Sequence, residues 1–83
     1  MHEYSLVQAM FDQIRRAMSE RDAIAVRRVR VRIGAFAGVE PALFRTAYDV
    51  YRVGTACAGA SLEIVDASDT DELTLDQLEL GVP

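Results

Sequence analysis

The chain begins with Met1, His2 and Glu3, and the first two of these residues could chelate a metal ion. The α-amine of Met1, the amide nitrogen of His2 and a ring nitrogen of His2 can close fused chelate rings around one ion. A planar set of nitrogen ligands suits Ni(II) or Cu(II) in square-planar geometry. His2 is the only histidine, and its bulk at position 2 is expected to keep Met1 in place. The alternative is that His2 is an ordinary residue near the chain start, because a single imidazole is a weak indication of a metal site.

Other chemistry is poorly supported by the sequence. Cys57 is the only cysteine, which excludes a four-thiolate zinc site and an internal disulfide. We expect Cys57 to be a small buried apolar residue. The chain has no phosphate-binding loop and no Ser-His-Asp or Cys-His set. An enzyme is therefore not expected.

A first helix is predicted over residues 5–20, where Ser5 followed by Gln8 forms a capping box. Apolar residues then recur at helical spacing and give one apolar stripe. Its members are Leu6, Val7, Met10, Phe11, Ile14, Ala17 and Met18. After a short reversal, residues 26–33 alternate as a half-buried strand does. Its inward residues are Val29, Val31 and Ile33, and its outward residues are Arg28, Arg30 and Arg32.

A second helix is predicted to begin at Pro41, because proline suits the first helical turn, and to end before Gly54. Its predicted buried stripe is Leu43, Phe44, Ala47, Tyr48 and Tyr51. Two further strands are predicted at residues 61–66 and 72–80, and their acids could pair with the arginine stripe. The short connection over residues 66–71 predicts that these two strands form an antiparallel hairpin. A phase slip between Leu75 and Leu78 predicts either a β-bulge or an early end to the strand pairing.

These elements predict an α+β fold in which two helices pack on one face of a three-stranded mixed sheet, in the order α-β-α-β-β. The first helix is about 24 Å long at roughly 1.5 Å per residue, and the first strand is about 26 Å long at roughly 3.3 Å per residue. Because the two are antiparallel and nearly equal in length, residues 1–3 should lie near the loop of residues 34–40. Glu40 is then within reach of His2. Glu40 could also act as a carboxylate at a helix N-terminus, which is favoured by about 0.3–1 kcal/mol.

Length and composition indicate one ordinary globular domain over residues 1–83, with 51% hydrophobic and 27% charged residues. The net charge of −4 argues against a nucleic-acid partner. No apolar run approaches the roughly 20 residues that span a bilayer, and no signal peptide is recognised at the start. With a single cysteine as well, we expect a cytoplasmic protein and no membrane partner.

Several short blocks together resemble the HypA family of nickel metallochaperones for hydrogenase maturation. The blocks are MHEYSL at residues 1–6, VRIG at residues 31–34 and GVEP at residues 38–41. The resemblance runs from residue 1 to about residue 66 and resumes over residues 71–80. It implies a nickel site formed by the amino terminus of Met1, by His2 and by Glu3, with the acidic residue at the position of Glu40 also involved.

One departure from the family is large. The family carries a zinc domain with two CxxC pairs between its last two strands, whereas this chain has a short turn at residues 66–71. No zinc is therefore expected. The zinc domain was either removed by design or is naturally absent, and the sequence is compatible with both.

The resemblance implies a nickel-binding metallochaperone module for the maturation of NiFe hydrogenase. Ni(II) would be its metal, and its partners would be a HypB-type GTPase and the hydrogenase large subunit. The alternative is an interaction scaffold that lacks zinc and keeps the fold without delivering metal. The oligomeric state is left open.

Overall fold

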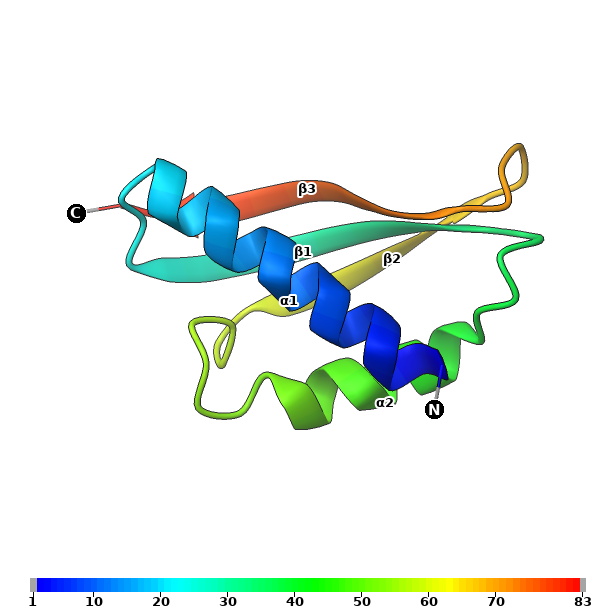
Figure 1. The fold of residues 1–83 in the computed structure, drawn as a ribbon, viewed down its shortest axis with the longest axis horizontal. Helices are drawn as coiled ribbons and strands as arrows, with labels where there is room; N and C mark the ends of the chain where they lie inside the picture. Colours follow the sequence, from blue (N-terminus) through cyan, green and yellow to red (C-terminus); the bar gives the residue numbers. More distant parts are fainter. Residues whose placement is uncertain (1, 83) are drawn as a thin grey trace.

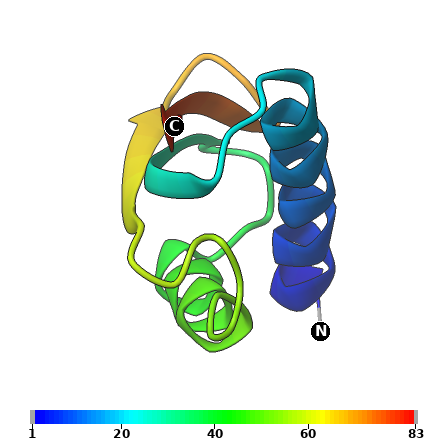
Figure 2. The same cartoon turned by 90° about the vertical axis from the view of Figure 1, so that its left-hand side faces the viewer.

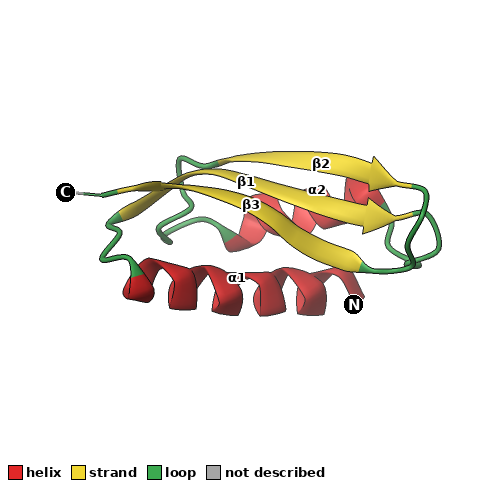
Figure 3. Ribbon diagram, turned by 90° about the horizontal axis from the view of Figure 1, so that it is seen from above, coloured by secondary structure: helices red, strands yellow, loops and turns green. Residues whose placement is uncertain are grey.

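The computed structural model describes residues 2–82, with side chains for residues 3–82. In chain order the elements are α1 (His2–Glu20), β1 (Ala25–Gly34), α2 (Pro41–Tyr51), β2 (Ser61–Ala67) and β3 (Leu73–Gly81). Both helices pack on the same face of the sheet (Figure 1 and Figure 3). The predicted α+β class and the order α-β-α-β-β are confirmed.

β1 is the central strand of the sheet. The strand order is β2-β1-β3, with β1 parallel to β2 and antiparallel to β3. The predicted hairpin of residues 61–65 with residues 72–80 is therefore wrong. The crossover through α2 makes β2 the parallel neighbour of β1, and the chain then passes the end of β1 to reach its other edge. At this crossing the Gly34 amide donates to the Glu72 carbonyl over 2.9 Å.

Charge explains why β1 separates the other two strands. Arg30 Nε lies 2.6 Å from a Glu63 carboxylate oxygen on β2, and Arg30 Nη1 lies 3.8 Å from Asp76 on β3. The hydrogen bond with Arg30 holds the pKa of the Glu63 carboxyl below its ordinary value. A β2–β3 hairpin would instead have placed acids beside acids, which is unfavourable. The predicted pairing of the arginine stripe with acids of both neighbouring strands is confirmed.

β3 contains a bulge, which was one of the two predicted alternatives, and its pairing with β1 continues on both sides of the bulge. Arg30 pairs with Gln77 and Val31 pairs with Leu75, so Asp76 is the extra residue. A bulge shifts the alternation of side chains by one position. Leu78, like Leu75, is consequently half-buried on the helix side of the sheet.

The core lies between the sheet and the two helices (Figure 2). The inward residues of β1 are buried as predicted: Val29, Val31 and Ile33. Phe11 of α1 packs against two rings of α2, with centroid distances of 6.0 Å to Tyr48 and 4.9 Å to Tyr51. Cys57 is buried, as predicted.

Two local predictions for the helices need correction. α1 begins at His2, so Ser5 is an exposed residue inside the helix and not its cap. The helix begins earlier than predicted because Glu3 stabilises its first turn, where a carboxylate is favoured. The Glu3 side chain also makes a tertiary contact there. On α2, Leu43 was expected in the buried stripe but is 46% exposed.

Candidate metal centre

The first turn of α1 carries the residues predicted to bind metal. Met1 and the side chain of His2 lie outside the described part of the structure, so the predicted chelate has no described geometry. The backbone of His2 is described, and His2 is the first residue of the helix. The first four N–H groups of an α-helix have no acceptor within the helix. The amide nitrogens of His2 and Glu3 are therefore not used by the helical hydrogen-bond ladder.

Glu3 is a buried carboxylate, with 8% of its surface exposed. One of its side-chain oxygens accepts a hydrogen bond from the backbone N–H of Glu40 at 3.4 Å. This contact joins the start of α1 to the start of α2, and Figure 1 shows the two helix starts side by side. The predicted return of the chain start to the loop of residues 34–40 is thus confirmed for Glu3.

Glu40 acts as the N-cap of α2. Its exposed side chain accepts a hydrogen bond from the Ala42 N–H at 3.4 Å, and Pro41 occupies the first helical turn. The helix-terminus role proposed for Glu40 is therefore present. A role of this carboxylate in metal binding stays a prediction.

The buried state of Glu3 was not anticipated, although the sequence contains a sign of it. Glu3, Val7, Met10 and Ile14 follow the helical spacing of a single face, and the last three are buried core residues. Extending the apolar stripe back by one turn would have placed Glu3 on the buried face. A carboxylate there needs a hydrogen-bond donor, and the Glu40 amide is one.

Within residues 3–82, whose side chains are described, no group of three or more His, Cys, Asp or Glu residues is placed to hold a metal ion. The residues brought together here are Glu3 and Glu40. In the same part of the chain, no helix is long and apolar enough to cross a membrane.

Comparison with known proteins decides the family. A family described as hydrogenase/urease nickel incorporation, metallochaperone, hypA matches residues 1–74. The chain belongs to the HypA family. The resemblance read from the sequence is thereby confirmed.

Curated HypA proteins match about three quarters of the chain. The hydrogenase maturation factor HypA of Shewanella baltica strain OS185 is 38% identical over 64 residues, which cover 77% of this chain and 55% of the relative. The HypA of Beijerinckia indica is 39% identical over 66 residues, which cover 80% of this chain and 58% of the relative. The chain thus spans little more than half the length of the curated HypA relatives that it matches.

Solved HypA structures share the fold. A solution structure of the nickel metallochaperone HypA from Helicobacter pylori has a TM-score of 0.75 at 26% identity, covering 90% of this chain and 70% of that one. A second HypA solution structure has a TM-score of 0.67 at 27% identity, covering 93% of this chain and 71% of that one. The two-helix, three-stranded arrangement is that of HypA.

Proposed function

We propose that this chain binds Ni(II) as cargo through Met1, His2 and Glu3 and passes it on during hydrogenase maturation. The observation that carries the proposal is the start of α1 at His2. Because the first amides of a helix lack helical acceptors, the amide protons of His2 and Glu3 can leave on metal binding without breaking the helix. Membership of a nickel-incorporation family supports nickel over copper.

In this proposal Glu3 has two roles. Its backbone nitrogen is a candidate ligand, while its carboxylate holds the first helical turn against Glu40. Glu40 lies close enough to the first turn to act as an additional acidic group.

The proposed partners are a HypB-type GTPase and a hydrogenase large subunit, in the cytoplasm. The family description, which names hydrogenase and urease nickel incorporation, supports partners in maturation, and the two specific partners are carried over from the resemblance. The chain spans only part of its relatives, so the proposal concerns the nickel module alone. No structural zinc is proposed, because Cys57 is the only cysteine.

The second candidate is an interaction scaffold without metal transfer. The single cysteine supports it, since the thiolates of a zinc domain are missing. The fold would then serve only to bind partner proteins. Nickel binding separates the two candidates.

The deciding experiment is a nickel titration of protein with an unmodified Met1, followed by absorption and NMR spectroscopy. We expect a yellow, diamagnetic, equimolar complex whose affinity falls as the pH drops below the ordinary histidine pKa of about 6.5, because protons compete for the ligands. Adding Gly-Ser before Met1 blocks the amine and should weaken binding at least about tenfold. Equal affinity of the extended protein would exclude the terminal chelate, and no binding by either protein would favour the scaffold.

Substitutions then assign the side chains. His2→Ala should abolish the square-planar spectrum, and the matched control Glu63→Gln, on the outer face of β2, should leave nickel affinity unchanged. Glu40→Gln is the informative variant. If it changes only thermal stability, the carboxylate of Glu40 is solely a helix cap and the site reduces to Met1, His2 and Glu3.

A further inference from the structure

β3 presents an open sheet edge. It pairs with β1 along one side only, so its other side carries backbone donors and acceptors that can bind a further strand. The opposite edge of the sheet is protected at the start of β2: Arg45 donates to the Leu62 carbonyl at 3.0 Å and Tyr48 donates to the Ala60 carbonyl at 2.8 Å. Among the hydrogen bonds of the described residues, none runs from a side chain to a carbonyl of β3.

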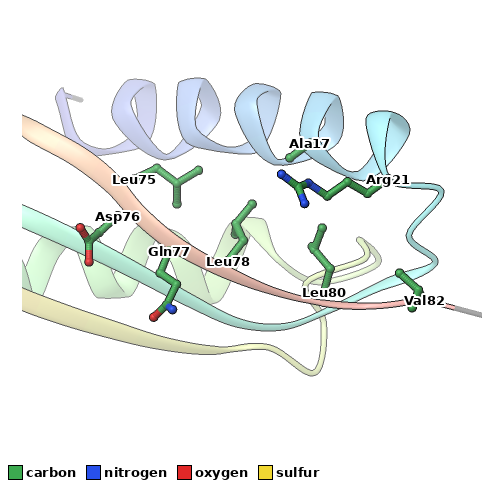
Figure 4. A pocket seen from close by; sticks show the side chains of 8 residues that line it. All are labelled: Ala17, Arg21, Leu75, Asp76, Gln77, Leu78, Leu80 and Val82. Atoms are coloured by element: carbon green, nitrogen blue, oxygen red, sulfur yellow. The ribbon is translucent and has the colours of Figure 1, made fainter.

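A groove runs beside this edge, between β3 and the C-terminal half of α1. Its volume is about 520 Å³, and one wall is formed by Ala17 of α1 and by Arg21, which directly follows the helix. Figure 4 shows three leucines of β3 pointing toward α1, while Asp76 and Gln77 point away. The leucines are Leu75, Leu78 and Leu80, all half-buried. An added strand would place alternate side chains on this apolar floor.

The outer face of β3 is acidic. Asp76 lies 3.8 Å from Arg30 and Glu79 lies 3.9 Å from Arg28, and the two acidic side chains stay 33% and 57% exposed, so a further cation can approach them. The strand Leu73–Gly81 contains no basic residue. A second copy of the chain that paired through its own β3 edge would bring the same acids, Asp76 and Glu79, against this face, and like charges facing each other across strands are unfavourable. The edge is therefore complementary to a basic strand and not to itself.

β1 shows what such a strand looks like. Residues 28–33 alternate arginine with Val or Ile, and they lie against the paired side of β3 with Arg28 Nε 3.9 Å from Glu79. The open side of β3 borders the same acidic outer face of the sheet and the same leucines on the helix side. A strand in which basic and apolar side chains alternate would therefore match both faces.

We propose that the open edge of β3, from Gln77 to Gly81, binds an extended segment of another protein as a fourth, antiparallel strand. In this segment apolar side chains alternate with arginine or lysine. The apolar side chains enter the groove beside Leu78 and Leu80, and the basic ones face Glu79. The site begins at Gln77 because the bulge at Asp76 bends the strand before it. The proposal is independent of nickel binding.

A peptide with the sequence of residues 28–33, blocked at both ends, is the probe. We expect it to shift the backbone amide NMR signals of Gln77–Gly81 and of Ala17, and to bind less tightly as salt is added, because charge pairs at a surface are screened. The matched control peptide is N-methylated on alternate amides, which keeps charge and apolarity but removes the donors of one strand edge. It should bind at least about tenfold more weakly. Equal binding of the two peptides would refute strand pairing.

Protein variants test the charge and the place of binding. Glu79→Gln should weaken peptide binding severalfold, whereas Glu63→Gln removes the same charge from β2 and should not. An equal loss in both variants, or shifts centred on Ser61–Ala67, would overturn the assignment to β3. Dimerisation of the peptide-free protein with shifts at Gln77–Gly81 would show that a second copy is the occupant and would also overturn the proposal.

Discussion

Replacing Gly34 with alanine tests the unexpected strand order most directly. Gly34 is the last residue of β1, and the segment leading from β2 to β3 crosses it there. A Cβ atom at position 34 would lie 2.6 Å from the Thr70 carbonyl carbon and 3.0 Å from the Glu72 amide nitrogen, with the Thr70 carbonyl oxygen closer still. All of these are backbone atoms, so no flexible side chain can move aside.

The expected cost follows from two opposing effects. Inserting a methyl group into a packed site costs about 1–3 kcal/mol, while exchanging glycine for alanine stiffens the unfolded chain and returns about 0.4–1 kcal/mol. The free energy of unfolding should therefore fall by about 1–2 kcal/mol, which is a drop in melting temperature of several degrees for a domain of this size. Urea denaturation followed by circular dichroism measures it.

Gly59→Ala is the matched control. A Cβ atom at Gly59 would meet no heavy atom within 4 Å, so this variant should be as stable as the parent or slightly more stable. If Gly34→Ala were as stable as Gly59→Ala, the crossing segment would not lie against the end of β1. The order β2-β1-β3 would then be wrong.

Three further predictions concern the core, the first turn of α1 and metals. Burial raises the pKa of Tyr48 to about 12, so its neutral form stabilises the fold fully below the ordinary tyrosine pKa of about 10, and this contribution is lost as pH rises toward 12. Tyr48→Phe should flatten that alkaline decline in urea denaturation and cost only about 1 kcal/mol near neutral pH, because the Ala60 carbonyl keeps a hydrogen bond from Arg52 at 3.3 Å. Glu3→Ala removes the acceptor for the Glu40 amide and should also lower the free energy of unfolding by about 1 kcal/mol; an unchanged value would mean that the contact is not maintained in solution. EDTA should leave the helical circular dichroism signal intact, since no structural metal is expected to hold the fold, and loss of the signal would contradict this.

Alternation and helical spacing were sufficient to predict most of the fold. The inward residues of β1 and the apolar stripe of α1 follow local periodicity, which depends only on neighbours in the chain. The bulge at Asp76 was also visible as a local slip in phase. The predicted hairpin was wrong because a short connection also allows β3 to cross to the far edge of the sheet, where its acids meet the arginines of β1. The acids of β2 and β3 both need the arginines of β1, and this requirement involves three strands at once.

The candidate site was predictable only in part. Equal lengths of helix and strand correctly placed Glu3 near the loop that ends at Glu40. The capping-box pattern at Ser5 suggested a later helix start, because a local cap motif does not report the tertiary contact that Glu3 makes one turn earlier. The exposure of Leu43 was missed for a related reason. Helical spacing predicts which residues share the apolar face of α2, but how many of them are buried depends on how α1 and the sheet pack against α2.

The central position of β1 also matters while the chain is being synthesised. β1 is complete at Gly34, but its partners are complete only at Ala67 and Gly81, so the strand leaves the ribosome with both edges open. An unpaired strand that is rich in valine and isoleucine can pair with the same strand of a neighbouring nascent chain. Arg28, Arg30 and Arg32 oppose this, because identical strands brought together would place cations beside cations. Once β2 and β3 have emerged from the ribosome, their acids can pair with these arginines. The arginines therefore favour pairing of β1 with strands of its own chain over pairing between chains.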